Sequence, residues 1–442
     1  MVLEAANNTD KMVVEIVSEE NIVPSSPTPD HLRVFKLSFL DQIQAKIYVP
    51  LLLFFHNNQT SNQSSVIFDR SKLLKQTLSQ TLTQFYPLAG KVRDDFQIDC
   101  NDEGVHYVET RVEERLSDFL GRSPKNEMID LFIPQNATAS AIGNSVLMIR
   151  VNVFSCGGVA ISSCINHKFI DGDTYMLFFK HWTAAARGTL ETTSPSFTSQ
   201  SLFPQIPSLN FQSPVTIGKD KFVSQRFVFD GIDIAKLKSK TRSFTSGSEP
   251  TRYEVVGALL WKCVAKAAYK VNRSSLETPF NLGMAINLRG KKDIPRNVVG
   301  NLVWPWLSRC KLATDLEHHY LANQIKISKA QLSDDFIQVI KGDTGTTTVL
   351  QCAEIMMNSE ETSVAIWITT MCNMGVYELD FGWGKPVWFY YGNVNVANFI
   401  SLCETRVGGG VEAVVSLSKE EIAIIEKDPE LLAFASLNPA PL

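Results

Sequence analysis

The fold is decided by the stretch Val146–Arg187, which reads VLMIRVNVFSCGGVAISSCINHKFIDGDTYMLFFKHWTAAAR. Val146–Phe154 and Val159–Ile165 are rich in β-branched and aromatic residues, and the Gly157-Gly158 pair between them is typical of a hairpin turn. The later part of the stretch changes to a helical pattern with a broad apolar surface, as in a buried helix. The stretch therefore predicts two antiparallel strands, a short loop and a helix.

Two side chains that can take part in acid–base chemistry, His167 and Asp171, lie in that short loop. The helix should begin at Asp173 or Thr174, either of which can cap its first turn, and Gly188 lies just past its end. A histidine titrates near pH 6.5, so His167 can take and return a proton at neutral pH. Spacing alone leaves a second interpretation open, in which a buried, hydrogen-bonded histidine precedes an aspartate that merely caps a helix.

Other chemistries at this loop find less support in the sequence. A His-x-x-x-Asp pair needs further ligands to hold a metal ion, and no HExxH motif or Cys/His cluster supplies them. Cys164 and His167 have opposite parity along an extended strand, so they should point to opposite faces. There is no GxSxG elbow and no GxxxxGK phosphate loop. We therefore expect no metal site and no covalent nucleophile.

Length and composition are those of an ordinary globular protein. A chain of 442 residues with 44% hydrophobic and 20% charged residues predicts two domains, or three. The net charge of −4 gives no global attraction for nucleic acid. The longest apolar run, near Tyr48–Phe55, is far shorter than the ~20 residues of a membrane span. The N-terminus has no signal-peptide pattern, and the eight cysteines are scattered, so we expect a cytoplasmic protein with reduced thiols.

Along the chain, the pattern favours two α/β layered domains with mixed sheets rather than one continuous barrel. We expect an N-terminal domain at 1–188, a Ser/Thr/Pro-rich crossover segment at 189–220 and a C-terminal domain at 221–442. Strands are expected at Met12–Val17, Ile47–Phe55, Phe222–Phe229, Asn281–Arg289, Val364–Met371, Val387–Tyr391, Ala397–Cys403 and Gly410–Ser416, with Gln97–Cys100 paired to His106–Val112. Helices are expected at Ser71–Tyr86, Thr251–Lys270, Leu316–Leu332, Thr347–Met357 and Ser418–Asp428.

A second motif, DFGWGKP at 380–386, lies far along the chain from His167. Its Asp-Phe-Gly also occurs in protein kinases, but the HRD loop, glycine-rich loop and VAIK strand of those enzymes are missing. Taken alone, the motif is typical of a glycine-rich turn before an aromatic strand.

Together, HKFID at 167–171 and DFGWG at 380–384 resemble the paired motifs of the plant BAHD acyltransferase family. Further matches in order and spacing are PSSPTP at 24–29, LSFLD at 37–41, FYPLAGK at 85–91, CND at 100–102, CGG at 156–158, NLR at 287–289 and GN at 300–301. The residues of these motifs, PSSPTP and DFGWGKP in particular, are similar to those of the branch that contains vinorine synthase and deacetylvindoline acetyltransferase. That branch acylates alkaloid and other specialised-metabolite alcohols.

The resemblance implies a two-domain fold like that of chloramphenicol acetyltransferase, with a channel between the domains. His167 would then be the general base that deprotonates an acceptor hydroxyl, and the hydroxyl oxygen would attack the thioester of an acyl-CoA directly. The family's pattern pairs Asp171 with Arg289 in a salt bridge that supports the loop. Asp380 is assigned to the catalytic machinery without touching the substrate, because the family's DFGWG aspartate keeps the fold and the CoA channel in shape.

The same resemblance implies further contacts. CoA and acyl contacts would fall on Thr251 and Arg252, where a helix start suits a phosphate, and on Thr369, Thr370 and Trp383. Relatives carry Ser-Ser-Trp or Thr-Ser-Trp where this chain has Thr369-Thr370-Met371. The hydroxyls needed for an acyl or oxyanion contact are kept. The missing tryptophan leaves the size of the acyl pocket open.

We therefore expect a cytoplasmic, monomeric O-acyltransferase that uses acyl-CoA, chiefly acetyl-CoA, and the hydroxyl of a plant alkaloid or terpenoid. No bound cofactor, nucleic acid or membrane partner is expected. Amide formation on an amine acceptor would use the same residues and is the alternative. Metal-dependent hydrolysis and a non-catalytic binding protein are the readings from other classes. Metal-dependent hydrolysis would need a stoichiometric metal ion. A non-catalytic binding protein would have no reason to retain His167, Asp171 and the DFGWG motif.

Overall fold

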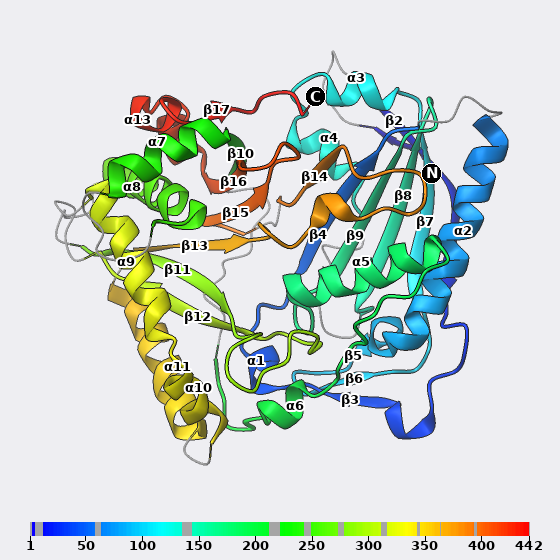
Figure 1. The fold of residues 1–442 in the computed structure, drawn as a ribbon, viewed down its shortest axis with the longest axis horizontal. Coiled ribbons are helices and arrows are strands. Elements are labelled where there is room, and N and C mark those ends of the chain that lie inside the picture. Colours follow the sequence, from blue (N-terminus) through cyan, green and yellow to red (C-terminus); the bar gives the residue numbers. More distant parts are fainter. Residues whose placement is uncertain are drawn as a thin grey trace.

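Two large mixed sheets lie side by side in the computed structural model of the protein (Figure 1). The structure describes residues 2–4, 12–57, 63–134, 144–211, 222–242, 249–272, 278–310, 316–342, 345–362, 364–392 and 396–441. Within these ranges, no helix combines the length and the apolar character needed to cross a membrane.

The first sheet has seven strands in the order β1-β2-β7-β8-β9-β4-β14. Its strands are β1 (Val2–Glu4), β2 (Val13–Ile22), β4 (Tyr48–Phe55), β7 (Val105–Val112), β8 (Leu147–Phe154), β9 (Val159–Asn166) and β14 (Trp388–Tyr390). The predicted hairpin is confirmed as β8 and β9, which pair antiparallel. Gly157 has a φ of 76°, which a glycine adopts without strain.

Helices cover both faces of this sheet. On one face, α2 (Gln63–Gln84) packs against α5 (Gly172–Ala186), and Trp182 of α5 is fully buried in the core they share. On the other face, α3 (Leu116–Leu120) and α4 (Asn126–Asp130) cover Phe54 and Trp388. The apolar stripe of the predicted helix is therefore buried, as its sequence requires.

The second sheet has seven strands in the order β12-β11-β13-β15-β16-β10-β17. Its strands are β10 (Phe222–Phe229), β11 (Phe280–Asn287), β12 (Val303–Ser308), β13 (Val364–Thr370), β15 (Phe399–Glu404), β16 (Val411–Ser418) and β17 (Ser436–Leu437). Its helices are α7 (Gly231–Arg242), α8 (Arg252–Asn272), α9 (His318–Gln331), α10 (Asp334–Lys341), α11 (Gly345–Thr362), α12 (Lys419–Ile425) and α13 (Pro429–Leu432).

The two halves are joined by an exchanged strand. β14 comes from the C-terminal half of the sequence, yet it pairs antiparallel with β4 and forms the edge of the first sheet. In the connecting segment, α6 (Ser199–Leu202) is a single short turn, and Ser196 forms a parallel bridge with Val298. The residues that follow DFGWG are therefore built into the sheet that carries His167.

One predicted strand pairing is wrong. β6 (Gln97–Asp99) does not pair with β7 but joins β3 (Val34–Lys36) and β5 (Lys91–Val92) in a separate three-stranded sheet. The backbone after β6 is taken by other segments, since Cys100 N–H donates to the Arg33 carbonyl and Gly104 N–H donates to the Ala89 carbonyl. These longer-range bonds lead the chain out of one sheet and into the other.

Two helix starts also differ from expectation. α2 begins at Gln63, eight residues before the predicted Ser71. α5 is capped by Asp171 rather than by Asp173 or Thr174, because the Asp171 side chain accepts a hydrogen bond from the Thr174 N–H at 2.9 Å. The remaining short elements are α1 (Phe39–Gln42) and the 3₁₀ turns η1 (Asp30–Leu32), η2 (Tyr86–Ala89) and η5 (Val376–Glu378).

Candidate active site

His167 lies at the point where two internal chambers meet. The larger chamber has a volume of about 650 Å³ and the smaller chamber about 100 Å³. Six residues line both of them, and the polar ones among these are Gln44, His167, Thr369 and Tyr391. Any reaction that joins a molecule in one chamber to a molecule in the other must take place beside these four side chains.

The His167 imidazole is held in its neutral form. It follows β9 directly, and its backbone N–H donates to the Ile47 carbonyl at 2.9 Å. Burial lowers the pKa of His167 below its usual 6.5, and this outweighs the opposing effects of loop hydrogen bonds and of the Asp171 charge. Nδ1 is enclosed and has no hydrogen-bond partner among the described residues. A neutral imidazole is a proton acceptor at neutral pH.

Asp171 and Arg289 form the salt bridge that the sequence analysis expects. The guanidinium meets the carboxylate in two places, Nη1 to Oδ2 at 2.6 Å and Nη2 to Oδ1 at 3.1 Å, and both side chains are buried. Arg289 also donates to the Gly300 carbonyl, and the Leu302 N–H donates to Asp171 Oδ2. Since every strong bond of Asp171 goes to protein groups, the carboxylate shapes the loop and the start of α5.

A second support of the loop was not found from sequence. The Asn301 side-chain amide donates both to the His167 carbonyl at 2.9 Å and to Asp41 Oδ1 at 3.0 Å, and the Asn301 backbone N–H donates to Asp41 at 2.8 Å. The Ser38 backbone N–H and hydroxyl both donate to the other carboxylate oxygen, Asp41 Oδ2. Burial raises the pKa of Asp41 to about 6. LSFLD and GN contain these residues, but neither motif reveals a bond between positions 260 apart.

Thr369 and Tyr391 place two hydroxyls beside His167. Thr369 is hydrogen-bonded to Tyr391, and burial raises the pKa of Tyr391 to about 12, so its hydroxyl stays protonated. Thr370, in contrast, lines only the larger chamber and accepts a hydrogen bond from the Cys372 N–H at 3.1 Å. Tyr391 was missed from sequence because it appears there only as part of an aromatic strand.

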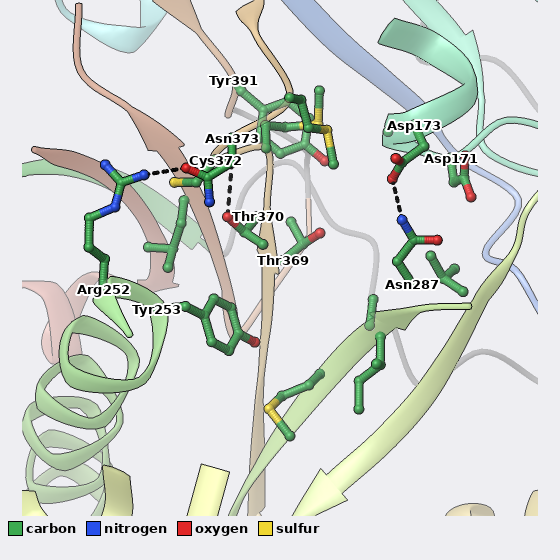
Figure 2. Close-up of a pocket in the computed structure, with 18 of the residues that line it drawn as sticks. Asp171, Asp173, Arg252, Tyr253, Asn287, Thr369, Thr370, Cys372, Asn373 and Tyr391 are labelled. Carbon is green, nitrogen blue, oxygen red and sulfur yellow. Dashed lines mark hydrogen bonds between the residues drawn. The ribbon is translucent and has the colours of Figure 1, made fainter. Parts of the chain in front are cut away.

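The larger chamber has a basic wall. Figure 2 shows Arg252 and Tyr253 at the start of α8 on one side, and Asp171 and Asp173 at the start of α5 on the other, with Thr369 and Thr370 between them. Thr251 forms the predicted capping box with Glu254, at 2.9 and 3.3 Å. Lys238, Arg252 and Lys329 also line the chamber. Thr251 and Arg252 are thus brought together with His167.

Asp380 and Trp383 are not brought to either chamber. Asp380 Oδ1 accepts hydrogen bonds from the backbone N–H groups of Gly382 at 2.7 Å and Gly384 at 2.9 Å, so it folds the glycine-rich turn on itself. The Trp383 ring stacks on Phe381, with centroids 5.5 Å apart, and the Arg70 guanidinium lies over it at 5.0 Å. Trp383 packs against the hydrophobic core of the first sheet, and neither Asp380 nor Trp383 lines a chamber.

Comparison with known proteins identifies the family. A family model described as the Transferase family matches residues 12–432. The chain belongs to this family, the BAHD acyltransferases. It is 36% identical to the limonoid 7-O-acetyltransferase of Citrus sinensis, covering 98% of this chain and 100% of the relative. It is 33% identical to the stemmadenine O-acetyltransferase of Catharanthus roseus, covering 94% and 96%.

Solved structures of similar proteins share the BAHD fold. The crystal structure of vinorine synthase matches with a TM-score of 0.83 and 31% identity, covering 97% of this chain and 100% of that one. F. graminearum TRI101, complexed with coenzyme A and T-2 mycotoxin, matches in fold at 15% identity, a TM-score of 0.69 and coverage of 92% and 99%. Taken with its relatives, this BAHD protein is an acyl-CoA-dependent O-acyltransferase.

Met371 is buried beside the start of α5. Its backbone N–H donates to the Leu402 carbonyl, and only 2% of its surface is exposed. A Cβ added at Gly172 would lie 2.7 Å from the Met371 sulfur, so the thioether fills the space beside the start of α5.

Among the described residues, no group of three or more His, Cys, Asp or Glu side chains could hold a metal ion.

Proposed function

We propose that the protein transfers an acetyl group from acetyl-CoA to a hydroxyl of a plant terpenoid or alkaloid, with His167 as the general base. The named relatives support this, since they include limonoid 7-O-acetyltransferase, limonoid 21-O-acetyltransferase and stemmadenine O-acetyltransferase. The observation that carries the proposal is a neutral His167 at the junction of the two chambers.

The reaction follows from that position. His167 takes the proton of the acceptor hydroxyl while the hydroxyl oxygen forms a bond to the thioester carbonyl carbon. The resulting tetrahedral intermediate carries a negative oxygen. The C–S bond then breaks, the acetyl ester is released, and the CoA sulfur leaves as a thiolate that takes the proton back from His167. No acyl-enzyme forms, and the base returns to its neutral state.

Hydroxyl donors beside His167 are suited to the negative oxygen. Thr369 and Tyr391 line both chambers, and each carries an O–H that can donate. Gln44 is less suited because its amide nitrogen already donates to the Leu40 carbonyl at 2.8 Å. We assign the oxyanion contact to the Thr369–Tyr391 pair and leave Thr370 as a contact to the acyl-CoA chain.

Acyl-CoA occupies the larger chamber in this proposal. CoA carries several phosphate charges, and in the chamber wall Arg252 lies at the first turn of α8 and Lys238 lies on α7. Asp171 and Arg289 hold the His167 loop. Asp380 keeps the DFGWG turn closed and Trp383 fills its core side, so both act through the shape of the protein.

The finer assignments belong to the same proposal. The enzyme works as a cytoplasmic monomer with no resident cofactor, and acyl-CoA is its co-substrate. It partners neither nucleic acid nor membrane. An amine acceptor would use the same base and give an amide, but the named relatives favour the ester.

The test is release of free CoA. Purified enzyme is mixed with acetyl-CoA and a set of terpenoid and alkaloid alcohols, and His167→Ala is run beside His167→Gln as a second neutral variant. We expect acceptor-dependent thiol release that falls by about 10³-fold or more in both variants, with an ester as the product by mass spectrometry. Full activity of His167→Ala would refute the mechanism, and an amide product would establish the alternative.

A further inference from the structure

The two chambers differ in charge, and the charged residues gather in one of them. Lys238, Arg252 and Lys329 line the larger chamber, and of these Lys329 is already paired with Glu254 at 3.1 Å. Its two carboxylates are already engaged. Asp171 is paired with Arg289 at 2.6 Å, and Asp173 accepts a hydrogen bond from the Asn287 amide at 2.8 Å (Figure 2). The larger chamber is therefore suited to a polyanion and leaves the smaller chamber for the acceptor.

The smaller chamber carries no charged side chain among the described residues that line it. Its walls are aliphatic and aromatic, and its polar groups are the four that it shares with the larger chamber. Trp367 and Phe399 lie opposite each other on the paired strands β13 and β15. Trp367 is fixed against β11, because a Cβ added at Gly283 would lie 2.4 Å from its ring.

An unpaired cation is poorly accommodated by such walls. A protonated amine would leave water without meeting a carboxylate, and the cost of burying an unpaired charge exceeds what cation–π contact with an aromatic ring returns. A neutral ring system faces no such cost and gains from burial against Trp367 and Phe399.

We infer that this enzyme is selective for electrically neutral alcohols, so that terpenoid alcohols are its acceptors and an alkaloid alcohol reacts only while its amine is deprotonated. The inference rests on the proposed function, because it assigns the acceptor to the smaller chamber at His167. The inference distinguishes terpenoid alcohols from alkaloid alcohols, whereas the relatives are named for acceptors that include limonoids and stemmadenine.

The first experiment compares substrates in the full-length enzyme. A neutral terpenoid alcohol, a basic alkaloid alcohol and the quaternary N-methyl derivative of that alkaloid are each supplied with acetyl-CoA. The pH is set well below and well above the pKa of the alkaloid amine. Dividing each rate by that of the neutral alcohol at the same pH removes the titration of His167 and Asp41 from the comparison.

We expect kcat/KM of the protonated alkaloid to be at least ~10-fold below that of the neutral alcohol, because its charge would be buried without a partner. A tenfold ratio corresponds to a difference of about 1.4 kcal/mol in free energy. The ratio should recover as the amine loses its proton, and the quaternary derivative should stay at least ~10-fold below the neutral alcohol at both pH values. Equal turnover of the quaternary derivative would overturn the inference and leave the proposed function standing. No thiol release with any alcohol would instead count against the proposed function.

A matched pair of variants tests the chamber itself. Ala45 lines the smaller chamber, so Ala45→Asp supplies the missing carboxylate and Ala45→Asn supplies a side chain of the same shape without charge. The relative kcat/KM for the cationic substrate should be at least ~10-fold higher in Ala45→Asp than in Ala45→Asn. Identical ratios in two folded variants would contradict the inference. If either variant fails to fold, the substrate comparison decides the question.

Discussion

At the scale of single residues, Asn301 is the side chain through which the two halves of the protein hold the general base. Its amide bonds the His167 carbonyl and Asp41 at once, and Asn301 and Asp41 are fully buried. Losing that amide frees the His167 loop to shift, and small misplacements of a catalytic group are costly to the rate.

We predict that Asn301→Ala lowers kcat by about 10- to 100-fold while the KM for acetyl-CoA changes little. The matched control is Asn152→Ala, which removes another fully buried amide with bonds to the Phe132 and Ala160 carbonyls, far from His167. Both variants should lose stability, but only Asn301→Ala should lose kcat. Parallel losses of kcat in the two variants would reduce Asn301 to a purely structural residue.

The ionisation of His167 predicts the acid side of the pH profile. Burial lowers its pKa below 6.5, so the neutral base persists below that pH and is lost as the pH falls through the lowered pKa. Asp41, with its pKa raised to about 6, takes up a proton near that pH and then accepts more weakly from Asn301. The logarithm of kcat/KM should therefore stay flat down to pH 6.5 and fall at lower pH, as first Asp41 or His167 and then the other group takes up a proton. A midpoint above 6.5 would contradict the buried, neutral base.

At this scale, the sequence predicts a functional role only for residues whose role is known from a family motif. His167, Asp171 and Arg289 carry recognisable spacing, and the structure brings all three together. Asn301 lies in the GN motif and Tyr391 in an aromatic strand, but neither signal showed a role, because an amide or a phenol becomes functional only through neighbours that the fold supplies.

At the scale of elements, the start of α5 is fixed by a single carboxylate with two tasks. Asp171 caps the helix and also closes the buried ion pair with Arg289. Both tasks depend on the same loop geometry. The sequence placed the helix correctly but assigned the cap to its neighbours, because Asp171, Asp173 and Thr174 all suit a helix start and only three-dimensional contacts distinguish them.

We predict that Asp171→Ala lowers the free energy of unfolding by about 3–5 kcal/mol, because it leaves the Arg289 guanidinium buried without its partner. Urea unfolding followed by circular dichroism measures the change. Lys236→Ala breaks the surface pair with Asp233 on α7 and should change stability little, since solvent already screens that pair. Equal effects of the two substitutions would mean that Arg289 finds a new partner when Asp171 is lost.

Strand pairing shows the limit of element-level prediction. The β8–β9 hairpin was predictable because a glycine turn joins two adjacent apolar runs. β6 and β7 are nearly as close in sequence, yet they pair in different sheets, because backbone bonds to Arg33 and Ala89 redirect the chain between them. Local pattern cannot weigh a short hairpin against partners from distant segments.

At the scale of the whole molecule, the halves of the chain are interlocked. β14 completes the first sheet from the far end of the sequence, and its Trp388 packs against Phe54 with ring centroids 5.0 Å apart. The Asp171–Arg289 and Asp41–Asn301 contacts also join residues from the two halves. No short-range pattern could reveal this exchange, since β14 reads locally as one more strand of its own half.

Interlocking predicts how the protein behaves when it is divided at the proposed boundary after residue 188. Expressed alone, 1–188 would lack β14, leave Phe54 uncovered and bury Asp171 and Asp41 without Arg289 and Asn301. We predict that 1–188 by itself aggregates or lacks a cooperative unfolding transition, and that 189–442 by itself does the same. Expressed together, the fragments should recover acetyl transfer, because each supplies the missing strand and charges of the other. Circular dichroism, size-exclusion chromatography and thiol release follow the three samples. Cooperative unfolding of isolated 1–188 would show that the first sheet is complete without its seventh strand, and the exchange would then serve only to align His167 with the chambers.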